Sequence, residues 1–116
     1  MEAMYKLKND VYRKRRGGKA EVYDIYCTQC SDHVLTYQKD GIGRLLRLYL
    51  NRILAPPELE RLQKEPIHNP NELSDLVCGG CETVLATPVQ HFDGRYALLI
   101  RQGFIKKERY QGEVRR

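Results

Sequence analysis

Cys27-Thr28-Gln29-Cys30 and Cys78-Gly79-Gly80-Cys81 together contain the four cysteines of this chain of 116 residues. Two thiolates with two residues between them can hold one metal ion from a single tight turn, which we call a knuckle. Two such knuckles supply the closed set of four sulfur ligands that structural Zn²⁺ prefers. The spacing therefore predicts one Zn²⁺ bound by Cys27, Cys30, Cys78 and Cys81, with iron as the rival metal because four thiolates accept either ion.

The length and composition are those of a domain that benefits from a metal. A chain of 116 residues fits one domain, and with two Phe and no Trp its core must be filled by eight Tyr and the aliphatic residues. Such a core gives modest stability by itself. A bound metal ion would add the folding free energy that the core lacks.

The chain carries no sign of a membrane or secretory segment. No stretch approaches the roughly 18 apolar residues of a membrane span, and residues 1–19 carry charges where a signal peptide needs an apolar run. We therefore expect a cytoplasmic protein that does not enter a membrane. In that reducing compartment, paired cysteines hold metal or perform redox chemistry far more often than they form permanent disulfides.

A redox site is the alternative interpretation of Cys78-Gly79-Gly80-Cys81, because disulfide oxidoreductases use the same spacing. Their reactive cysteine lies at a helix N-terminus, which lowers its pKa. Here residues 82–87 have β character, and Pro88 follows where a helix would have to continue. The pattern favours metal binding over redox catalysis.

Each cysteine pair is followed by the same arrangement of two apolar runs and a turn. After Cys30 come residues 34–37, Asp40-Gly41 and residues 44–50, and after Cys81 come residues 84–87, Asp93-Gly94 and residues 95–100. Asp-Gly between apolar runs is a strong hairpin signal because glycine tolerates the positive φ of tight turns. Residues 22–26, rich in β-branched and aromatic side chains, predict a strand that leads into the first knuckle. We therefore expect a mainly β, antiparallel domain of two knuckle-hairpin halves around one ion, related by an approximate two-fold axis.

Helical structure is expected near the end of the first half and in the segment between the halves, residues 55–75. Residues 44–54 fit a helix with one apolar face, but Leu46, Leu48 and Leu50 alternate as in a strand, which we favour for 44–50, with helical structure from about Asn51. A short helix is expected over 57–64, because proline is tolerated in a first turn, and Pro66 would end it. Residues 66–75 should form an exposed connection.

Basic residues gather at both ends of the chain. Residues 1–20 hold seven Lys or Arg and two acidic residues, residues 95–116 hold the same numbers, and residues 21–94 hold six Lys or Arg and eleven acidic residues. Like charges repel and Gly17-Gly18 favours no structure, so we expect a flexible basic arm over 1–20. The zinc-bound β domain would then span 21–105, and a basic tail 106–116.

This charge distribution suggests an anionic partner, and nucleic acid or a ribonucleoprotein is the preferred one. Tyr12, Phe104 and Tyr110 could stack on bases. Arg115 and Arg116 would add charge at the end of the tail. The candidate nucleic-acid contacts are Arg13, Lys14, Arg15, Arg16, Lys19, Arg44, Arg47, Arg52, Lys106, Lys107 and Arg109.

The sequence contains no recognisable catalytic set. His33 is close enough to Cys30 to donate a hydrogen bond to a sulfur or to replace a ligand, although a surface position in the knuckle loop is the simpler interpretation. His68 and His91 have no nucleophile or carboxylate at a catalytic spacing. We therefore expect a binding module and not an enzyme. A protein-protein adaptor that docks through an apolar hairpin face or the proline-rich connection is the second hypothesis, and a thiol or metal-dependent enzyme is the third.

The repeated order of strand, knuckle and hairpin over roughly residues 22–105 resembles the zinc-ribbon superfamily. The resemblance implies that Cys27/Cys30 and Cys78/Cys81 pin β-hairpins around one ion, and it says little about function, since zinc ribbons serve in transcription, translation and protein docking. A weaker likeness is to Yippee-like β-folds, which also hold two such pairs and end on a strand like residues 97–106. The chain departs from the common knuckle pattern because Ser31 and Glu82 stand where glycine usually follows the second cysteine.

Overall fold

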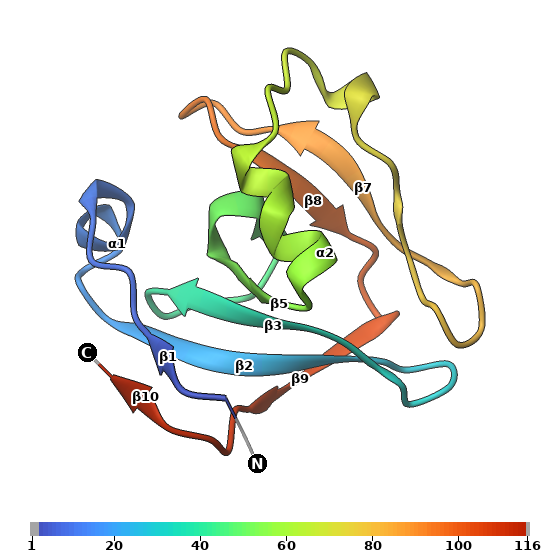
Figure 1. Cartoon of the computed structure of the whole chain (residues 1–116), viewed down its shortest axis with the longest axis horizontal. Coiled ribbons are helices and arrows are strands. Elements are labelled where there is room, and N and C mark those ends of the chain that lie inside the picture. Colours follow the sequence, from blue (N-terminus) through green and yellow to red (C-terminus); the bar gives the residue numbers. More distant parts are fainter. Residues whose placement is uncertain (1–2, 116) are drawn as a thin grey trace.

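The computed structural model describes residues 3–115 and shows a mainly β fold (Figure 1). Within these residues, the sheets are joined by short helices, of which α1 and α2 are α-helical and η1 to η3 are 3₁₀ helices. In chain order the elements are β1 (Tyr5–Lys6), α1 (Val11–Arg15), β2 (Ala20–Cys27), β3 (His33–Asp40), β4 (Arg47–Tyr49), η1 (Leu50–Arg52), β5 (Ile53–Ala55), α2 (Pro57–Glu60), η2 (Arg61–Lys64), η3 (Pro70–Glu72), β6 (Leu76–Val77), β7 (Val84–Gln90), β8 (Tyr96–Ile100), β9 (Ile105–Arg109) and β10 (Val114–Arg115).

Two four-stranded antiparallel sheets form the body of the molecule. The first sheet has the strand order β5-β3-β2-β9, and the second has the order β4-β8-β7-β6. In Figure 1 strands β2, β3 and β9 lie below α2, whereas β7 and β8 lie above it. The expectation of a mainly β, antiparallel domain with a short helix between its halves is confirmed.

The hairpin predicted around Asp93-Gly94 is present. Strands β7 and β8 pair with Gln90 opposite Tyr96, and Gly94 adopts a φ of 93°. The backbone N–H of Gly94 donates to the carbonyl of His91. Glycine fits this turn because it takes a positive φ without a steric penalty.

The hairpin predicted around Asp40-Gly41 is wrong. Strand β3 pairs with β2 and β5, and the run after the turn contributes β4 to the other sheet, opposite β8. The backbone N–H of Gly41 instead donates to the carbonyl of Lys19, which continues the ladder between β3 and β2. Arg52 holds the Asp40 carboxylate at 2.7 Å. The chain therefore leaves the first sheet after Asp40, in a crossover that we define as residues 41–46, and Ile42 in it is 82% exposed.

Residues 44–54 contain both of the structures that the sequence allowed. The expected strand over 44–50 is shorter, since only Arg47–Tyr49 form β4, and the expected helical structure from about Asn51 is the single turn η1. Leu48 and Leu50 are buried, whereas Leu46 is 41% exposed. The structure therefore begins the strand later than the alternation of leucines suggests.

The helix expected over 57–64 is present as α2 followed directly by η2. Pro57 occupies the first turn and Glu58 and Glu60 lie in it, where the positive end of the helix favours acidic side chains. Leu59 and Leu62 pack against the main core. Residues 66–75 follow as a largely exposed connection that contains η3.

The main core lies between the two sheets and includes metal-ligand candidates. It contains Ile25, Leu35 and Tyr37 of the first sheet and Leu85 and Leu98 of the second, with Cys27 and Cys78 buried among them. Removal of such aliphatic surface from water contributes about 25 cal/mol per Å² to folding. A second, smaller cluster is formed by Leu7, Ala20 and Val22.

The ends of the chain differ from the predicted arm and tail. Strand β1 pairs in parallel with β10, α1 is capped by Asp10, and β9 pairs with β2 over five positions from Tyr23 to Cys27. Residues 3–20 and 106–115 are thus built into the fold, because their apolar members complete the second cluster and their backbones complete a sheet. Strands β1 and β10 lie side by side at the lower left of Figure 1. The predicted arm also includes residues 1 and 2, which lie outside the described residues.

No helix among residues 3–115 is long and apolar enough to cross a membrane.

Candidate metal centre

Each knuckle is the turn of a β-hairpin. Cys27 ends β2 and β3 begins at His33, while Cys78 follows β6 and β7 begins at Val84. Both turns lie at the right of Figure 1, where the first and second sheets approach each other. The knuckles therefore precede β3 and β7 as predicted, but they connect β2 to β3 and β6 to β7, and the first is not followed by a separate hairpin.

The two knuckles share the same backbone hydrogen bonds. In the first, the N–H of Cys27 donates to the carbonyl of Asp32 and the N–H of Ser31 donates to the carbonyl of Cys27, both at 2.9 Å. In the second, the N–H of Cys78 donates to Thr83 and the N–H of Glu82 donates to Cys78, also at 2.9 Å. This correspondence supports the expected similarity of the two halves at their metal-binding turns.

Ser31 and Glu82 adopt the conformation that glycine usually provides in such turns. Their φ angles are 68° and 61°, and they are the described non-glycine residues with positive φ. For residues with a side chain, this region costs roughly 1–2 kcal/mol. Ser31 and Glu82 therefore take the left-handed conformation without being glycine, at the cost of local strain.

The four sulfur atoms form a compact cluster. All Sγ atoms lie within 4.8 Å of one another, with Cys27 to Cys81 at 3.7 Å and Cys30 to Cys78 at 3.5 Å. In a tetrahedron with metal–sulfur bonds of about 2.3 Å, neighbouring sulfurs are about 3.8 Å apart. The spacing also exceeds the roughly 2.05 Å of a disulfide, and all four thiols are free. The residues present therefore fit one tetrahedral metal ion.

The thiols have unequal acidity in the absence of an ion. Hydrogen bonds from the side chain and backbone of Thr83 lower the pKa of Cys81 to about 7. The backbone N–H of Asp32 favours the Cys30 thiolate, but burial and hydrogen bonds with the other three sulfurs outweigh it and raise the pKa of Cys30 to about 12. Four thiolates this close repel one another, so a cation that binds them must displace protons.

Close packing between the knuckles keeps the sulfurs together. A Cβ atom added at Gly80 would overlap the carboxylate of Asp32 and lie 3.4 Å from the Sγ of Cys30. At the neighbouring Gly79, the same addition would meet nothing within 4 Å. The second knuckle therefore touches the first at Gly80, where a larger residue would displace the side chain of Asp32.

His33 takes no part in the sulfur cluster. Its Nε2 lies 2.8 Å from the Asp24 carboxylate and its ring packs edge-on against Tyr26. It is exposed at the start of β3. The surface position was the simpler of the two interpretations, and the structure agrees with it.

Arg52 was wrongly predicted as a nucleic-acid contact. Its side chain is 1% exposed and forms ion pairs with Asp10 and Asp40. A guanidinium buried in this way cannot reach a phosphate in solution. Its charge links α1 and β3 to η1.

The predicted contacts at the C-terminal end lie on β9 and are largely engaged within the protein. Lys106 pairs with Glu108 at 3.5 Å, Arg109 pairs with Glu21 at 2.7 Å, and Lys107 lies over the ring of Tyr23. The rings expected to stack on bases are also occupied, since Arg101 covers Phe104 and Tyr5 packs against Tyr110. Arg116 lies outside the described residues.

The remaining predicted nucleic-acid contacts divide into two groups. Arg13 donates to the carbonyl of Gly18, and Lys14 and Lys19 are exposed. Arg15, Arg16, Arg44 and Arg47 are brought together in one cleft of about 730 Å³, which Tyr12 also lines. We call this the basic cleft and define it by its cations, Arg15, Arg16, Lys39, Arg44, Arg47 and Arg95.

Sequence reasoning assigned no binding role to several residues of the basic cleft. Lys39, Tyr49, His91, Phe92 and Arg95 line it alongside the predicted arginines. The sequence accounts for four of them structurally. Tyr49 and Arg95 belong to predicted strands, and His91 and Phe92 border the predicted Asp93-Gly94 turn. No local pattern indicates that these segments meet.

Comparisons with known proteins do not place this chain in a family: no family model, no curated protein and no solved structure matches it. The likeness to zinc ribbons and Yippee-like β-folds therefore rests only on the cysteine cluster and the β fold. The chain is a mainly β protein in which four cysteines are positioned to hold one metal ion.

Proposed function

We propose that this protein is a nucleic-acid-binding module, not an enzyme, whose fold depends on one structural Zn²⁺. The observation that carries the metal assignment is the cluster of four Sγ atoms within 4.8 Å of one another. Four thiolates complete a tetrahedral shell and leave no position for a substrate, as is usual for structural zinc. Zinc rather than iron is proposed because no feature of the chain points to electron transfer.

The ion would cross-link the two sheets. Cys27 and Cys30 lie beside the first sheet, and Cys78 and Cys81 beside the second. Cys27, Cys30, Cys78 and Cys81 would hold Zn²⁺, which supplies strong bonds between elements far apart in the sequence. Because an unfolded chain has no such site, the binding free energy of the metal becomes folding free energy.

Metal analysis combined with thiol titration tests this assignment. We expect one zinc per chain and no thiol that reacts before denaturation, since all four would be ligands. A reactive cysteine in the native, metal-loaded protein would overturn the structural role and favour a thiol-dependent enzyme. Iron would give a visible thiolate-to-metal absorption and would replace zinc in the proposal.

Support for a nucleic-acid partner comes from the convergence of cations that are distant in the sequence. One cleft is lined by cations from several elements. They are Arg15 and Arg16 at the end of α1, Lys39 of β3, Arg44 of the crossover and Arg47 of β4. Such a concentration of positive charge attracts phosphates strongly and in a salt-dependent way.

Binding of a fluorescent single-stranded oligonucleotide, measured by anisotropy at about 50 mM and 200 mM salt, tests this partner. We expect saturable binding that weakens steeply at the higher salt. Absence of binding at low salt would exclude the proposal. Deletion of residues 1–20 or 106–116 is not a suitable test, because β1, β9 and β10 belong to the fold.

A protein-protein adaptor is the second candidate, favoured by apolar residues on the surface. Phe92 is 94% exposed and Ile42 is 82% exposed. Leu46 and Leu99, both 41% exposed, line the basic cleft. An adaptor would bind its partner with little dependence on salt, which separates it from a nucleic-acid-binding module in the same anisotropy format.

A further inference from the structure

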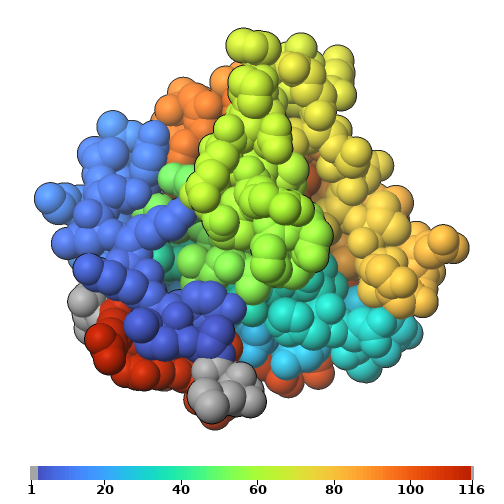
Figure 2. All heavy atoms as spheres, viewed as in Figure 1, coloured from blue at the N-terminus to red at the C-terminus, as the bar shows by residue number. Residues whose placement is uncertain are grey.

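The basic cleft lies where four parts of the chain meet. Its walls come from α1, from the end of β3, from the crossover with β4, and from the β7–β8 hairpin. In Figure 2, the blue atoms of the N-terminal segment and the orange atoms of the β7–β8 turn lie next to each other at the upper left. A volume of about 730 Å³ falls within the roughly 300–1,000 Å³ typical of ligand sites.

The charge of the cleft is strongly one-sided. Its six cations face two carboxylates, and both carboxylates are already paired, Asp40 with Arg52 at 2.7 Å and Asp93 with Arg95 at 2.9 Å. Among residues 3–115, no carboxylate forms an ion pair with Arg15, Arg16, Arg44 or Arg47. The surplus positive charge therefore remains available to an anion from outside.

Lys39 adds to this charge from the wall of the cleft. Its side chain is mostly buried, and its Nζ donates to the carbonyl of Gly41. Burial lowers the pKa of Lys39, and the nearby charges of Lys107 and Arg16 lower it further. A phosphate placed beside Lys39 and Arg16 would relieve this repulsion.

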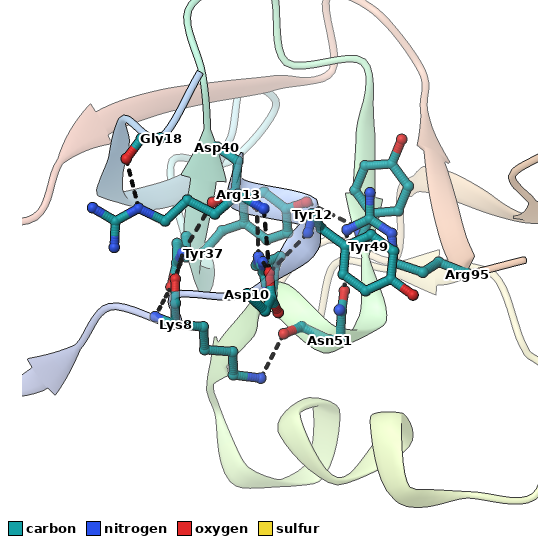
Figure 3. A network of polar contacts seen from close by, with 12 residues as sticks. Lys8, Asp10, Tyr12, Arg13, Gly18, Tyr37, Asp40, Tyr49, Asn51 and Arg95 are labelled. Atoms are coloured by element: carbon teal, nitrogen blue, oxygen red, sulfur yellow. Dashed lines mark hydrogen bonds and ion pairs between the residues drawn. The ribbon is translucent and has the colours of Figure 1, made fainter. Parts of the chain in front are cut away.

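A continuous row of π groups runs along the cleft. The guanidinium of Arg95 is sandwiched between two rings, 3.9 Å from the centroid of Tyr12 and 3.8 Å from that of Tyr49, as Figure 3 shows. Tyr49 then meets His91 edge-on at 5.4 Å, and His91 packs against Phe92 at 4.1 Å. The row begins on α1 and ends at Phe92, which is 94% exposed.

The centre of this row is held in place by polar contacts. Nε of Arg95 donates to the Asp93 carboxylate, and its Nη1 reaches the Oδ1 of Asn51 at 3.5 Å. Backbone and side-chain hydrogen bonds from Arg95 keep the pKa of Asp93 low despite its burial. Arg95 is therefore a fixed part of the row, whereas the exposed face of Phe92 has room for another ring.

We propose that single-stranded nucleic acid binds in the basic cleft, with its phosphates against Arg15, Arg16, Arg44 and Arg47 and a base stacked on Phe92. This inference rests on the proposed nucleic-acid function and gives it a location. The exposed ring of Phe92 selects this ligand over an acidic peptide. Carboxylates would satisfy the cations but offer no ring to Phe92, whereas every base has a π face. An exposed ring at the end of a stack also suits an unpaired base better than a duplex.

The test uses the full-length, metal-loaded protein and fluorescein-labelled single strands of twelve thymidine or twelve uridine nucleotides, with binding measured by anisotropy. Arg16→Ala/Arg44→Ala removes two exposed cations of the cleft. Arg61→Ala/Lys64→Ala is the matched control, because it removes the same charge from η2, outside the cleft. Phe92→Ala removes the ring, and Ile42→Ala removes an exposed apolar side chain that does not line the cleft.

We expect Arg16→Ala/Arg44→Ala to weaken binding about tenfold at 50 mM salt and to reduce the salt slope by about 1.4, as for two lost phosphate contacts. Phe92→Ala should weaken binding about fivefold or more, as for one lost base stack. The two controls should bind within about twofold of the wild type, because they leave the cleft intact. Melting temperatures should confirm that all four variants remain folded.

The remaining outcomes separate the location from the function. The wild type could bind while Arg16→Ala/Arg44→Ala and its control Arg61→Ala/Lys64→Ala lose affinity equally, or while Phe92→Ala and Ile42→Ala have equal effects. In either case the protein binds nucleic acid, but the basic cleft is not the site. If polyglutamate of similar length binds as tightly as the oligonucleotides, the cleft recognises negative charge alone and the stacking assignment is wrong. If no single strand binds at low salt, the function itself fails.

Discussion

The Sγ atoms of Cys30 and Cys78 lie 3.5 Å apart although their residues belong to knuckles beside different sheets. The second pair across the knuckles, Cys27 and Cys81, is separated by 3.7 Å. Two pairs of sulfur atoms therefore approach each other across the gap between the knuckles. A metal ion bound at this position would connect the two sheets, and its removal would leave four crowded thiols at their junction.

Metal removal should unfold the protein. A strong zinc chelator should abolish the near-ultraviolet circular dichroism signal of the tyrosines, because the small core cannot hold the sheets together without the ion. Addition of Zn²⁺ under reducing conditions should restore the signal, while Mg²⁺, which prefers oxygen ligands, should not. A chelated protein that keeps its signal and its melting temperature would contradict the assigned role of the metal.

Replacement of Glu82 by glycine should stabilise the protein. Glu82 has a φ of 61°, and relief of this strain outweighs the entropy that a glycine loses on folding, for a net gain of about 0.5–1 kcal/mol. Ser31→Gly should have the same effect in the other knuckle. Gln29→Gly is the control, since Gln29 is not among the positive-φ residues, and it should destabilise the protein. Chemical denaturation of the metal-loaded variants measures all three, and a loss of stability in Glu82→Gly would count against the knuckle geometry.

Gly80→Ala should be more damaging than Gly79→Ala. The added methyl group at Gly80 would overlap the carboxylate of Asp32, so the exposed Asp32 side chain must rotate away, at a cost of about 1 kcal/mol. Gly79 faces open space, so its replacement should change stability by less than about 0.5 kcal/mol. The measurements are the midpoint of denaturation and the competition for zinc with a chromophoric chelator. Equal tolerance of the two substitutions would mean that the knuckles do not touch as described.

Arg52→Ala should destabilise the fold by about 3–5 kcal/mol, because it leaves the carboxylates of Asp10 and Asp40 without their buried partner. Arg109→Ala breaks the exposed pair with Glu21 and should cost less than about 1 kcal/mol. Denaturant titration of both variants gives the comparison. Similar losses in the two variants would show that Arg52 is not the buried link between α1, β3 and η1.

The Asp10–Arg52 pair should also make stability depend on pH. The side-chain hydrogen bond from Arg52 lowers the pKa of Asp10 below its ordinary value of 3.8. A carboxyl group with a depressed pKa adds stability that is complete above the ordinary pKa and is lost as the pH falls through the folded-state pKa. Asp10→Asn keeps a side chain that can cap α1 but removes the charge.

The stability difference between wild type and Asp10→Asn should therefore be constant near neutral pH and shrink as the pH falls below 3.8. Both proteins lose metal affinity in acid, so the comparison must be made on the difference between them, by denaturant titration at several pH values. A difference that grows toward acid would reverse the sign of the linkage and refute the ion pair.

The two Asp-Gly turns explain how far local sequence predicts this fold. Asp93-Gly94 forms the expected hairpin, whereas Asp40-Gly41 has the same two residues and does not. The difference is tertiary, because Arg52 holds Asp40 and the backbone of Gly41 extends the pairing with β2. The clustering of Cys27, Cys30, Cys78 and Cys81, in contrast, was predictable, because the chemistry of metal binding depends on residue type and short spacing.

The basic cleft lay beyond sequence reasoning for the same physical reason. Arg95 lies between Tyr12 and Tyr49, which come from α1 and β4. Nothing in the local pattern of any one of these segments indicates the other two. The basic residues of α1 were predicted to bind nucleic acid as part of an arm, but the packing of α1 against the body gives four of the predicted arginines a shared site.

Zinc-edge X-ray absorption of the purified, metal-loaded protein tests whether four cysteines hold one tetrahedral ion, because it reports the number, type and distance of the atoms around the metal. We expect four sulfur scatterers at about 2.3 Å from one zinc ion per chain, with no nitrogen or oxygen neighbour. A mixed shell of sulfur with nitrogen or oxygen, or a fully folded protein that contains no metal, would contradict this expectation.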